Sequence, residues 1–415
     1  MKLDQLFNPS GLRDSEQLEV RINTIGTAAR VMIMATALSI FLPYYITSIV
    51  VGTVGFTFCV LPGTRDKIFI HKGAFTVAVF TLITAIVSLC YKNYMGLLRT
   101  GIFAAMIVIF FVTRALATKI FYERLLDVIC AGGTASSIGA VIELIVHRDE
   151  NFYRSKALFV NPNFFGAAIT LTVMICAYKA VVRGKNAKLF YFIAVINAAG
   201  IYACGSMALW GVAFIGILIL LLLNHEYRLL AVFFAVAATI LVTVVLVPQL
   251  IPRLNEISAT TDNRIKIWEF AIEQIKEAPI FGRGFFSYRF LYGQLSPERP
   301  ELYKAALAHN ILLDCMLSHG IVGTAVIGVF LGQFVKTVFE CHDGLKSRGN
   351  NYVITTFIAA VAGACAFYGM IDTTLIWVQN GMILLFIASG IGVDERSLRH
   401  KQHAERARNE KSYIK

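Results

Sequence analysis

The sequence predicts an all-α, polytopic membrane protein with about twelve transmembrane helices. Of its 415 residues, 57% are hydrophobic and only 15% are charged. In a soluble domain roughly a quarter of all residues are charged, so this composition excludes a water-soluble globular protein. The apolar residues are concentrated in runs of roughly 16 to 22, the length at which a helix crosses a hydrocarbon core of about 30 Å.

Charged clusters and turn residues divide the apolar runs into spans. In chain order we predict spans at 28–43, 45–61, 74–91, 96–113, 121–146, 162–181, 188–204, 206–223, 229–248, 310–335, 352–371 and 374–393. The first two spans are joined by a short hairpin around Pro43. The only turn signal between the seventh and eighth spans is Gly205-Ser206, so a total of eleven spans is an alternative.

The distribution of lysine and arginine predicts that both termini are cytoplasmic. With the N-terminus inside, 25 of the 38 basic residues fall on the cytoplasmic side, and the short loops agree on this orientation. We therefore expect a cytoplasmic tail at 1–27, a membrane domain at 28–393 with an external loop at 249–308, and a basic cytoplasmic tail at 394–415. The basic tail is expected to contact anionic lipid and not nucleic acid.

The external loop contains a predicted amphipathic helix at 261–278. Its apolar stripe consists of Ile265, Trp268, Ile272 and Ile275. Asp262 is the expected N-cap, and Pro279 ends the helix. A helix of this kind lies on the bilayer or caps the bundle.

Arg264 falls in the first turn of this predicted helix. Free backbone N–H groups and the positive end of the helix dipole favour an anion there. The guanidinium adds a planar pair of donors that suits phosphate. A solvated surface charge is the alternative interpretation of Arg264 taken alone.

Two further features of the loop suggest binding of an anion and a hydroxyl. Gly282 and Gly284 flank Arg283, and such glycines either direct N–H groups at a phosphate or form a plain re-entrant turn. His309 stands beside Asn310 where the chain re-enters the membrane. A histidine there can accept a proton from a sugar hydroxyl, or it can cap the following helix.

Few ionisable residues lie at membrane depth, and the clearest are Glu143, Asp314 and Asp372. A charge in hydrocarbon costs at least about 2.5 kcal/mol, so each is a functional candidate by default. For Glu143 and Asp372 the alternative is a position near the outer interface. The sequence contains no Asp-x-Asp and no His-Glu-x-x-His motif, and no cofactor is expected.

The order and spacing of several short motifs resemble the signature of the O-antigen ligase/polymerase family. The motifs are Asn161-Pro162-Asn163, Arg264-x-x-x-Trp268, Pro279-x-Phe281-Gly282-x-Gly284, His309-Asn310-x-x-Leu313 and Gly320-x-x-Gly323. With the spans and the long external loop, the resemblance covers nearly the whole chain. Taken by itself, Asn161-Pro162-Asn163 predicts the capped start of a helix with proline in its first turn.

The resemblance implies a metal-independent glycosyltransferase of the GT-C type in a bacterial cytoplasmic (inner) membrane. Such an enzyme moves a glycan from undecaprenyl diphosphate to an acceptor hydroxyl. The acceptor is another lipid-linked repeat unit in a polymerase and lipid A-core in a ligase. The motifs favour a polymerase of O-antigen or capsular units, with membrane lipid around it and a flippase or chain-length regulator as further partners.

Carried over to this chain, the family pattern makes Arg264 a ligand of the diphosphate and His309 the group that acts on the acceptor hydroxyl. Further substrate-binding candidates are Arg154, Arg283, Arg289 and Asn163. The family commonly has an arginine after the serine that opens the span at 206–223, where this chain has Met207. That second arginine is either missing or supplied from elsewhere, for instance by Arg154.

The chain also has Ser318 where the family often has an acidic residue. Two other functional classes remain as alternatives. A lipid-linked oligosaccharide flippase would carry a charged cavity and internal repeats, which the sequence does not show. A scaffold within a polysaccharide assembly complex would tolerate the loss of both Arg264 and His309.

Overall fold

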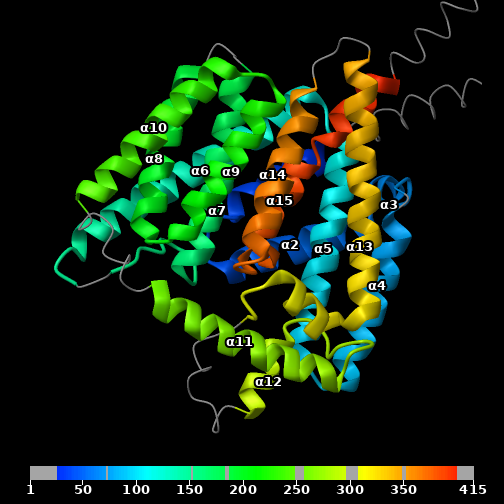
Figure 1. Ribbon diagram of the computed structural model, residues 1–415. Coiled ribbons are helices and arrows are strands. Elements are labelled where there is room, and N and C mark those ends of the chain that lie inside the picture. Colours follow the sequence, from blue (N-terminus) through cyan, green and yellow to red (C-terminus); the bar gives the residue numbers. More distant parts are fainter. Residues whose placement is uncertain are drawn as a thin grey trace, which may run out of the picture.

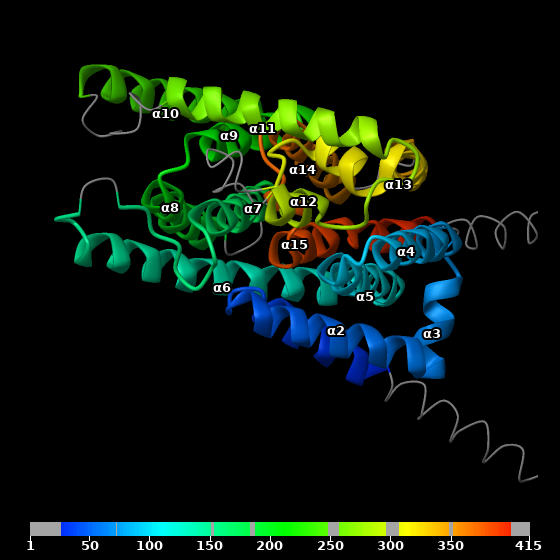
Figure 2. The same cartoon turned by 90° about the horizontal axis from the view of Figure 1, so that it is seen from below.

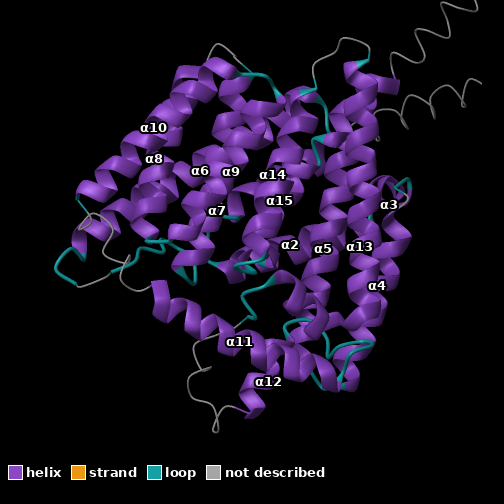
Figure 3. Cartoon of the chain, in the orientation of Figure 1, coloured by secondary structure: helices purple, strands orange, loops and turns teal. Residues whose placement is uncertain are grey.

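The protein is a bundle of helices with two further helices lying across one end (Figure 1). The computed structural model describes residues 26–71, 73–150, 153–182, 187–247, 257–295, 307–347 and 352–399. Viewed from that end, α2 lies at one edge of the bundle and α10 and α11 lie at the opposite edge (Figure 2). Every regular element in the described ranges is a helix and none is a strand, which confirms the predicted all-α class (Figure 3).

The helices follow the predicted apolar runs closely. A first helix covers 26–39. The others are α2 (Tyr44–Val60), α3 (Pro62–Phe69), α4 (Gly73–Cys90), α5 (Tyr94–Leu116), α6 (Lys119–Val146), α7 (Pro162–Val181), α8 (Ala187–Cys204), α9 (Met207–Leu223), α10 (Tyr227–Leu246), α11 (Ile257–Glu277), α12 (Ser287–Leu295), α13 (Ile311–Lys346), α14 (Val353–Gly369), the 3₁₀ helix η6 (Thr374–Ile376) and α15 (Val378–Ala388). Each of the twelve predicted spans thus contains a helix.

Two boundaries differ from the prediction. Helix α13 continues to Lys346, through residues expected to form a cytoplasmic loop, because polar side chains there are compatible with an exposed helix. The last predicted span is broken into η6, α15 and a further helix at 391–399. That further helix also crosses the expected boundary at 393 between membrane domain and tail. Residues 1–25 and 400–415 lie outside the described residues.

The structure supports a polytopic membrane protein but not the count of twelve spans. In the described chain, six helices are long and apolar enough to cross a membrane, and α2 with α3, bent by 91°, would make a seventh. The six are α4, α5, α6, α7, α10 and α13. Helices such as α9 and α14 have only 17 residues. At 1.5 Å per residue they reach about 26 Å, which is short of a typical hydrocarbon core.

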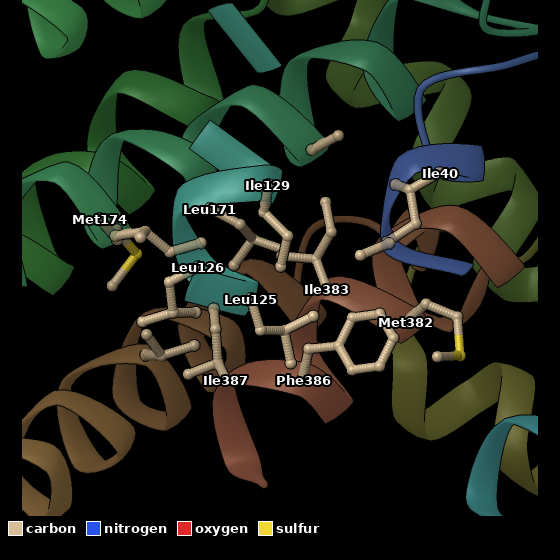
Figure 4. Close-up of a cluster of buried hydrophobic side chains, with 14 of the residues drawn as sticks. Ile40, Leu125, Leu126, Ile129, Leu171, Met174, Met382, Ile383, Phe386 and Ile387 are labelled. Atoms are coloured by element: carbon tan, nitrogen blue, oxygen red, sulfur yellow. The ribbon is translucent and has the colours of Figure 1, made fainter. Parts of the chain in front are cut away.

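Helix α7 forms the centre of the bundle. Nearly all of its side chains are buried, and it packs against α6, α8, α9 and α15. Its sequence is apolar on all sides, as expected for a helix that other helices surround. Figure 4 shows the adjoining core, where Leu125 of α6, Leu171 of α7 and Phe386 of α15 meet. This core fixes the relative positions of the elements that carry the candidate site.

The amphipathic helix of the loop is present as α11, but its packed face is shifted from the predicted stripe, of which Trp268 and Ile275 pack against the protein. Its buried residues are Ile267, Phe270, Ala271 and Gln274, and they contact a cluster that includes Tyr288, Leu291 and Leu317. Ile265 and Ile272 of the predicted stripe are 45% and 43% exposed. The sequence offers two neighbouring apolar stripes with the same helical spacing, and only the packing partner selects between them.

The start of α11 also differs from the prediction, whereas its end agrees. The helix begins at Ile257, so Asp262 lies within it and is not the N-cap. Arg264 is therefore beyond the first turn, and the argument from free N–H groups does not apply to it. The helix ends at Glu277, directly before Ala278 and Pro279, as the proline predicted.

A turn at 279–284 inserts into the hydrogen-bond ladder of α13. Gly320 has φ 61° and ψ −168°, which breaks the helix and leaves two N–H groups and two carbonyls without helical partners. Ile321 N–H donates to Pro279 O (2.8 Å) and Val322 N–H to Ile280 O (3.1 Å). In return, Leu317 O and Ser318 O accept from the N–H groups of residues 283 and 284 at 3.2 and 2.8 Å. We call this exchange the Gly320 interlock.

The interlock explains the glycines of the turn. Gly282 has φ 64°, and a Cβ added there would lie 2.5 Å from the carbonyl carbon of Ser318. Of the two interpretations of the glycine motif, the re-entrant turn is therefore correct. The N–H groups of Arg283 and Gly284 are already bonded to α13, so they do not form a phosphate-binding loop.

We predict that Gly320→Ala destabilises the protein by about 1–3 kcal/mol, because a side chain at positive φ is strained and its Cβ would meet the turn. The measurement is the free energy of unfolding in mixed detergent. Gly328→Ala is the matched control, since no atom lies within 4 Å of its added Cβ. Equal stability of the two variants would contradict the role of the interlock.

Candidate functional site

Segments far apart in the sequence meet at the end of the bundle where α11 lies. The connection before α7 contacts the turn between α8 and α9, through Arg154 and Cys204. The first residues of α7 contact the connection after α14, through Asn163 and Asp372. The residues before α13 reach the same connection, through His309. The first turns of these helices therefore surround one polar cluster.

Asp372 is the centre of this cluster. Its side chain is 2% exposed, and its Oδ1 accepts from the N–H groups of Thr373 (2.7 Å) and Thr374 (3.2 Å). Its Oδ2 accepts from Asn163 Nδ2 at 3.3 Å. These neutral donors hold the carboxylate in one orientation and partly compensate the desolvation of its charge. The sequence marked Asp372 as a membrane-depth carboxylate but did not place it in the site.

His309 approaches the carboxylate from the segment before α13. Its Nδ1 lies 3.4 Å from Asp372 Oδ1, which is close enough for an electrostatic contact although it is not aligned as a hydrogen bond. The capping role considered for His309 belongs to Asn310, whose Oδ1 accepts from the N–H groups of Leu312 and Leu313. His309 itself has φ 50° and a partly exposed side chain. Its imidazole can thus interact with a ligand.

Arg154 reaches the cluster through Asn163. Its Nη2 donates to Asn163 Oδ1 (2.6 Å), and its Nε donates to Cys204 O (2.8 Å). The side chain lies over Gly205, which has φ 62° and would place a Cβ 3.4 Å from Arg154 Cγ. Helix α9 begins two residues later, at Met207. The guanidinium therefore occupies the neighbourhood in which the family pattern has an arginine.

Asn163 has a local and a tertiary role. Asn161 Oδ1 accepts from Asn163 N–H at 2.8 Å and Pro162 occupies the first turn of α7, which confirms the capped helix start predicted from the sequence. The side chain of Asn163 then joins two charged groups, because its oxygen accepts from Arg154 and its amide nitrogen donates to Asp372. This bridge fixes the spacing between the cation and the carboxylate.

Arg264 lies on α11, the helix that crosses this end of the bundle (Figure 1). It is half-buried, and it acts electrostatically on Tyr368, near the end of α14. The Tyr368 hydroxyl accepts from Thr374 Oγ1 at 2.9 Å, directly beside the loop that holds Asp372. His309 thus lies beside the Asp372 carboxylate, Arg154 reaches it through Asn163, and Arg264 acts electrostatically on the neighbouring Tyr368.

The two other arginines proposed from the sequence lie elsewhere. Arg283 donates to Gln274 Oε1 at 2.6 Å and forms an ion pair with Glu277, so its guanidinium binds the last turns of α11. Arg289 is exposed on α12. The sequence does not reveal this difference, because the partners of each arginine are decided by how the segments fold against one another.

Arg99 is a cation that the sequence analysis did not select. Its guanidinium carbon lies 4.0 Å from the ring centroid of Trp377, 5.2 Å from that of Phe286 and 5.9 Å from that of Tyr44. Contacts of this kind stabilise a partly desolvated guanidinium. Trp377 in turn stacks on Phe164, which follows Asn163 in α7. The sequence could have indicated Arg99, because a basic residue within a predicted span is a functional candidate.

Residues 191–328 match the family model described as O-antigen ligase. No curated protein matches the chain. The family match confirms the resemblance to the O-antigen ligase/polymerase family and contains Arg264, His309 and the Gly320 interlock. Arg154, Asn163 and Asp372 lie outside the matched segment and join its residues only in the folded structure.

Among the residues that the structure describes, no group of three or more His, Cys, Asp or Glu side chains could hold a metal ion.

We predict that Asp372→Ala lowers the free energy of unfolding by about 1–3 kcal/mol, because it leaves buried donors without an acceptor. Asp372→Asn should lose less, since its amide oxygen can still accept from the N–H groups of Thr373 and Thr374. Detergent unfolding followed by circular dichroism measures both values. A stable Asp372→Ala protein would show that the carboxylate does not organise the cluster.

Proposed function

We propose that this protein is a membrane glycosyltransferase that moves a glycan from an undecaprenyl-diphosphate carrier to an acceptor hydroxyl. The observation that carries the proposal is the convergence of His309 and, through Asn163, Arg154 on one buried carboxylate, with Arg264 acting electrostatically on the adjacent Tyr368. The family match supports an O-antigen ligase/polymerase-like function. Polymerisation of O-antigen or capsular repeat units is our first choice, and ligation to lipid A-core is the alternative.

The proposed reaction breaks the bond between the anomeric carbon and the diphosphate oxygen and forms a bond to the acceptor oxygen. The diphosphate leaves with both electrons of the broken bond, so negative charge grows on its oxygens. Arg264 and Arg154 would stabilise that charge as paired donors. No metal or cofactor has a role in this scheme, which needs only a leaving group, a base and positive charge.

His309 would accept the proton of the acceptor hydroxyl in this reaction. An imidazole is suited to this step because its ordinary pKa lies near neutral pH. Asp372 lies beside Nδ1, where a carboxylate can orient the ring and stabilise its charged form. The other nitrogen, Nε2, is then the atom that would receive the proton. Asn163 keeps Asp372 and Arg154 apart at a fixed spacing.

The proposal includes a topology in a bacterial cytoplasmic (inner) membrane. Both termini are cytoplasmic, and the end with α11 and α12 faces outward, where lipid-linked glycans are polymerised or ligated. The proposal keeps the twelve spans expected from the sequence, as in a GT-C-like enzyme. Arg283 and Arg289 are secondary candidates for contacts with the glycan. A flippase that supplies the donor and a regulator of chain length are the partners we propose.

We predict that Arg264→Ala lowers transfer about 10²–10³-fold, since one donor to a developing charge contributes this much in other enzymes. Membrane insertion and expression should be unchanged. The measurement is gel analysis of polysaccharide in a deletion strain complemented with each variant. Lys266→Ala is the matched control, because Lys266 is an exposed cation on the same helix. Near-normal product from Arg264→Ala would refute the diphosphate role.

The same gel distinguishes the two acceptors. If the enzyme is a polymerase, the deletion strain retains single repeats on lipid A-core and only the wild-type gene restores long chains. If it is a ligase, the deletion strain shows bare lipid A-core. Long chains restored by both Arg264→Ala and His309→Ala would instead favour a transporter or a scaffold.

We predict that His309→Asn lowers transfer about 10²–10⁴-fold, the usual contribution of a positioned acid or base. Asparagine tolerates positive φ well, so this change removes the imidazole with little effect on the backbone. His225→Asn is the matched control, because exposed His225 also has positive φ and lies in the turn before α10. Full activity of His309→Asn would exclude proton transfer by His309.

A further inference from the structure

Glu143 is a carboxylate that the proposed mechanism leaves without a role. It lies near the end of α6 and accepts three hydrogen bonds from the connection to α7. The donors are the hydroxyl of Tyr153 (2.5 Å) and the backbone N–H groups of Lys156 (3.2 Å) and Ala157 (2.9 Å). We call residues 153–157 the strap.

A carboxylate is well suited to hold this strap. Its two oxygens offer about four acceptor positions, so one side chain can bind a phenol and two backbone groups together. Ala157 has φ 48°, a left-handed conformation that is unfavourable for a non-glycine residue. The bond from its N–H to Glu143 helps to offset this cost. The strap is thus held in a conformation that the chain alone would not favour.

Tyr153 strengthens the attachment. Its ring stacks on His147 with centroids 4.2 Å apart, and Nδ1 of His147 lies 2.8 Å from the carbonyl oxygen of Glu143. The hydrogen bond to Glu143 raises the pKa of the Tyr153 hydroxyl to about 12. A raised pKa favours the protonated phenol, so Tyr153 remains a donor to Glu143 at every pH below that value.

The strap determines where Arg154 lies. Tyr153 and Lys156 are bonded to Glu143 on the two sides of Arg154 and Ser155. Ser155 N–H donates to Ala203 O at 3.0 Å, which attaches the strap to the end of α8. Held from both sides, Arg154 extends over the turn before α9 and reaches Asn163.

We propose that Glu143 is a positioning residue that fixes the strap so that Arg154 supplies, at the start of α9, the cation that the chain lacks at Met207. The anion it would meet is the diphosphate of a polyprenyl-linked glycan, and this part rests on the proposed function. Glu143 acts through Arg154 and does not touch the substrate. The structural part of the inference concerns the strap alone and can be tested without any transfer assay.

The first test measures the accessibility of the strap. Ser155→Cys places a thiol at a fully buried position, in a background from which the exposed Cys59 and Cys90 have been removed. Maleimide labelling of the purified protein should be at least tenfold faster when Glu143→Leu is added. Tyr153→Phe removes only the phenol bond and should give a smaller increase. Unchanged labelling in Glu143→Leu would overturn the inference.

Two variants serve as controls for that test. Glu143→Gln should label like the parent, because its amide oxygen can accept from both N–H groups while its NH₂ donates to the phenol oxygen. Asp149→Asn changes an acidic side chain of the same connection that is 93% exposed, and it should also label like the parent. Fast labelling of both would mean that any change of charge loosens the strap, which would contradict the specific role of Glu143.

The second test asks whether Glu143 acts through Arg154. Glu143→Leu should raise the KM for the lipid-linked donor at least fivefold, and Glu143→Gln should restore it. Added to Arg154→Ala, Glu143→Leu should cause no further loss, whereas independent effects would multiply and overturn the proposal. If the wild-type protein shows no transfer, the proposed function fails, and the labelling test still decides the role of Glu143.

Discussion

The Gly320 interlock is the constraint on which the arrangement of the site depends. A helix that breaks inside an apolar bundle leaves backbone groups that must find partners, because no water is present to bind them. The turn at 279–284 supplies those partners, bond for bond. The exchange joins the end of α11 to the first turns of α13, so the helix that carries Arg264 is fixed relative to the helix that follows His309. Loss of the interlock would separate two candidate site residues without changing either.

Asp372 is a second buried group whose hydrogen-bond partners come from distant segments. A buried carboxylate is costly unless donors surround it, and here two backbone N–H groups and the Asn163 amide do so. The resulting negative centre can hold His309 beside it and, through Asn163, sets the position of Arg154. The site is therefore built from helix starts and connections, while the long apolar helices supply rigidity. In the same way, Glu143 accepts hydrogen bonds from the strap that precedes α7 and holds it in place.

Features that depend on neighbours along the chain, such as helix positions and helix ends, could be predicted from the sequence. The apolar runs predicted where helices lie, and Asn161 and Pro279 marked helix boundaries correctly because capping and proline act within a few residues, whereas Asp262 did not mark the start of α11. The number of membrane spans could not be predicted from the apolar runs, which gave twelve where the described chain has six helices long enough to span, or up to seven. Hydropathy identifies helical segments, but 17-residue helices such as α9 can be surrounded by protein and need not match the bilayer thickness.

The sequence by itself determined the all-helical class, the helical segments and a motif order that pairs Arg264 with His309 in one family pattern. Only the tertiary structure decided which face of α11 is buried, that the glycine turn binds α13, and that Asp372 lies beside His309. The physical reason is the range of the forces involved. Helix periodicity and capping depend on neighbours along the chain, whereas hydrogen bonds and ion pairs between distant segments depend on how the helices pack.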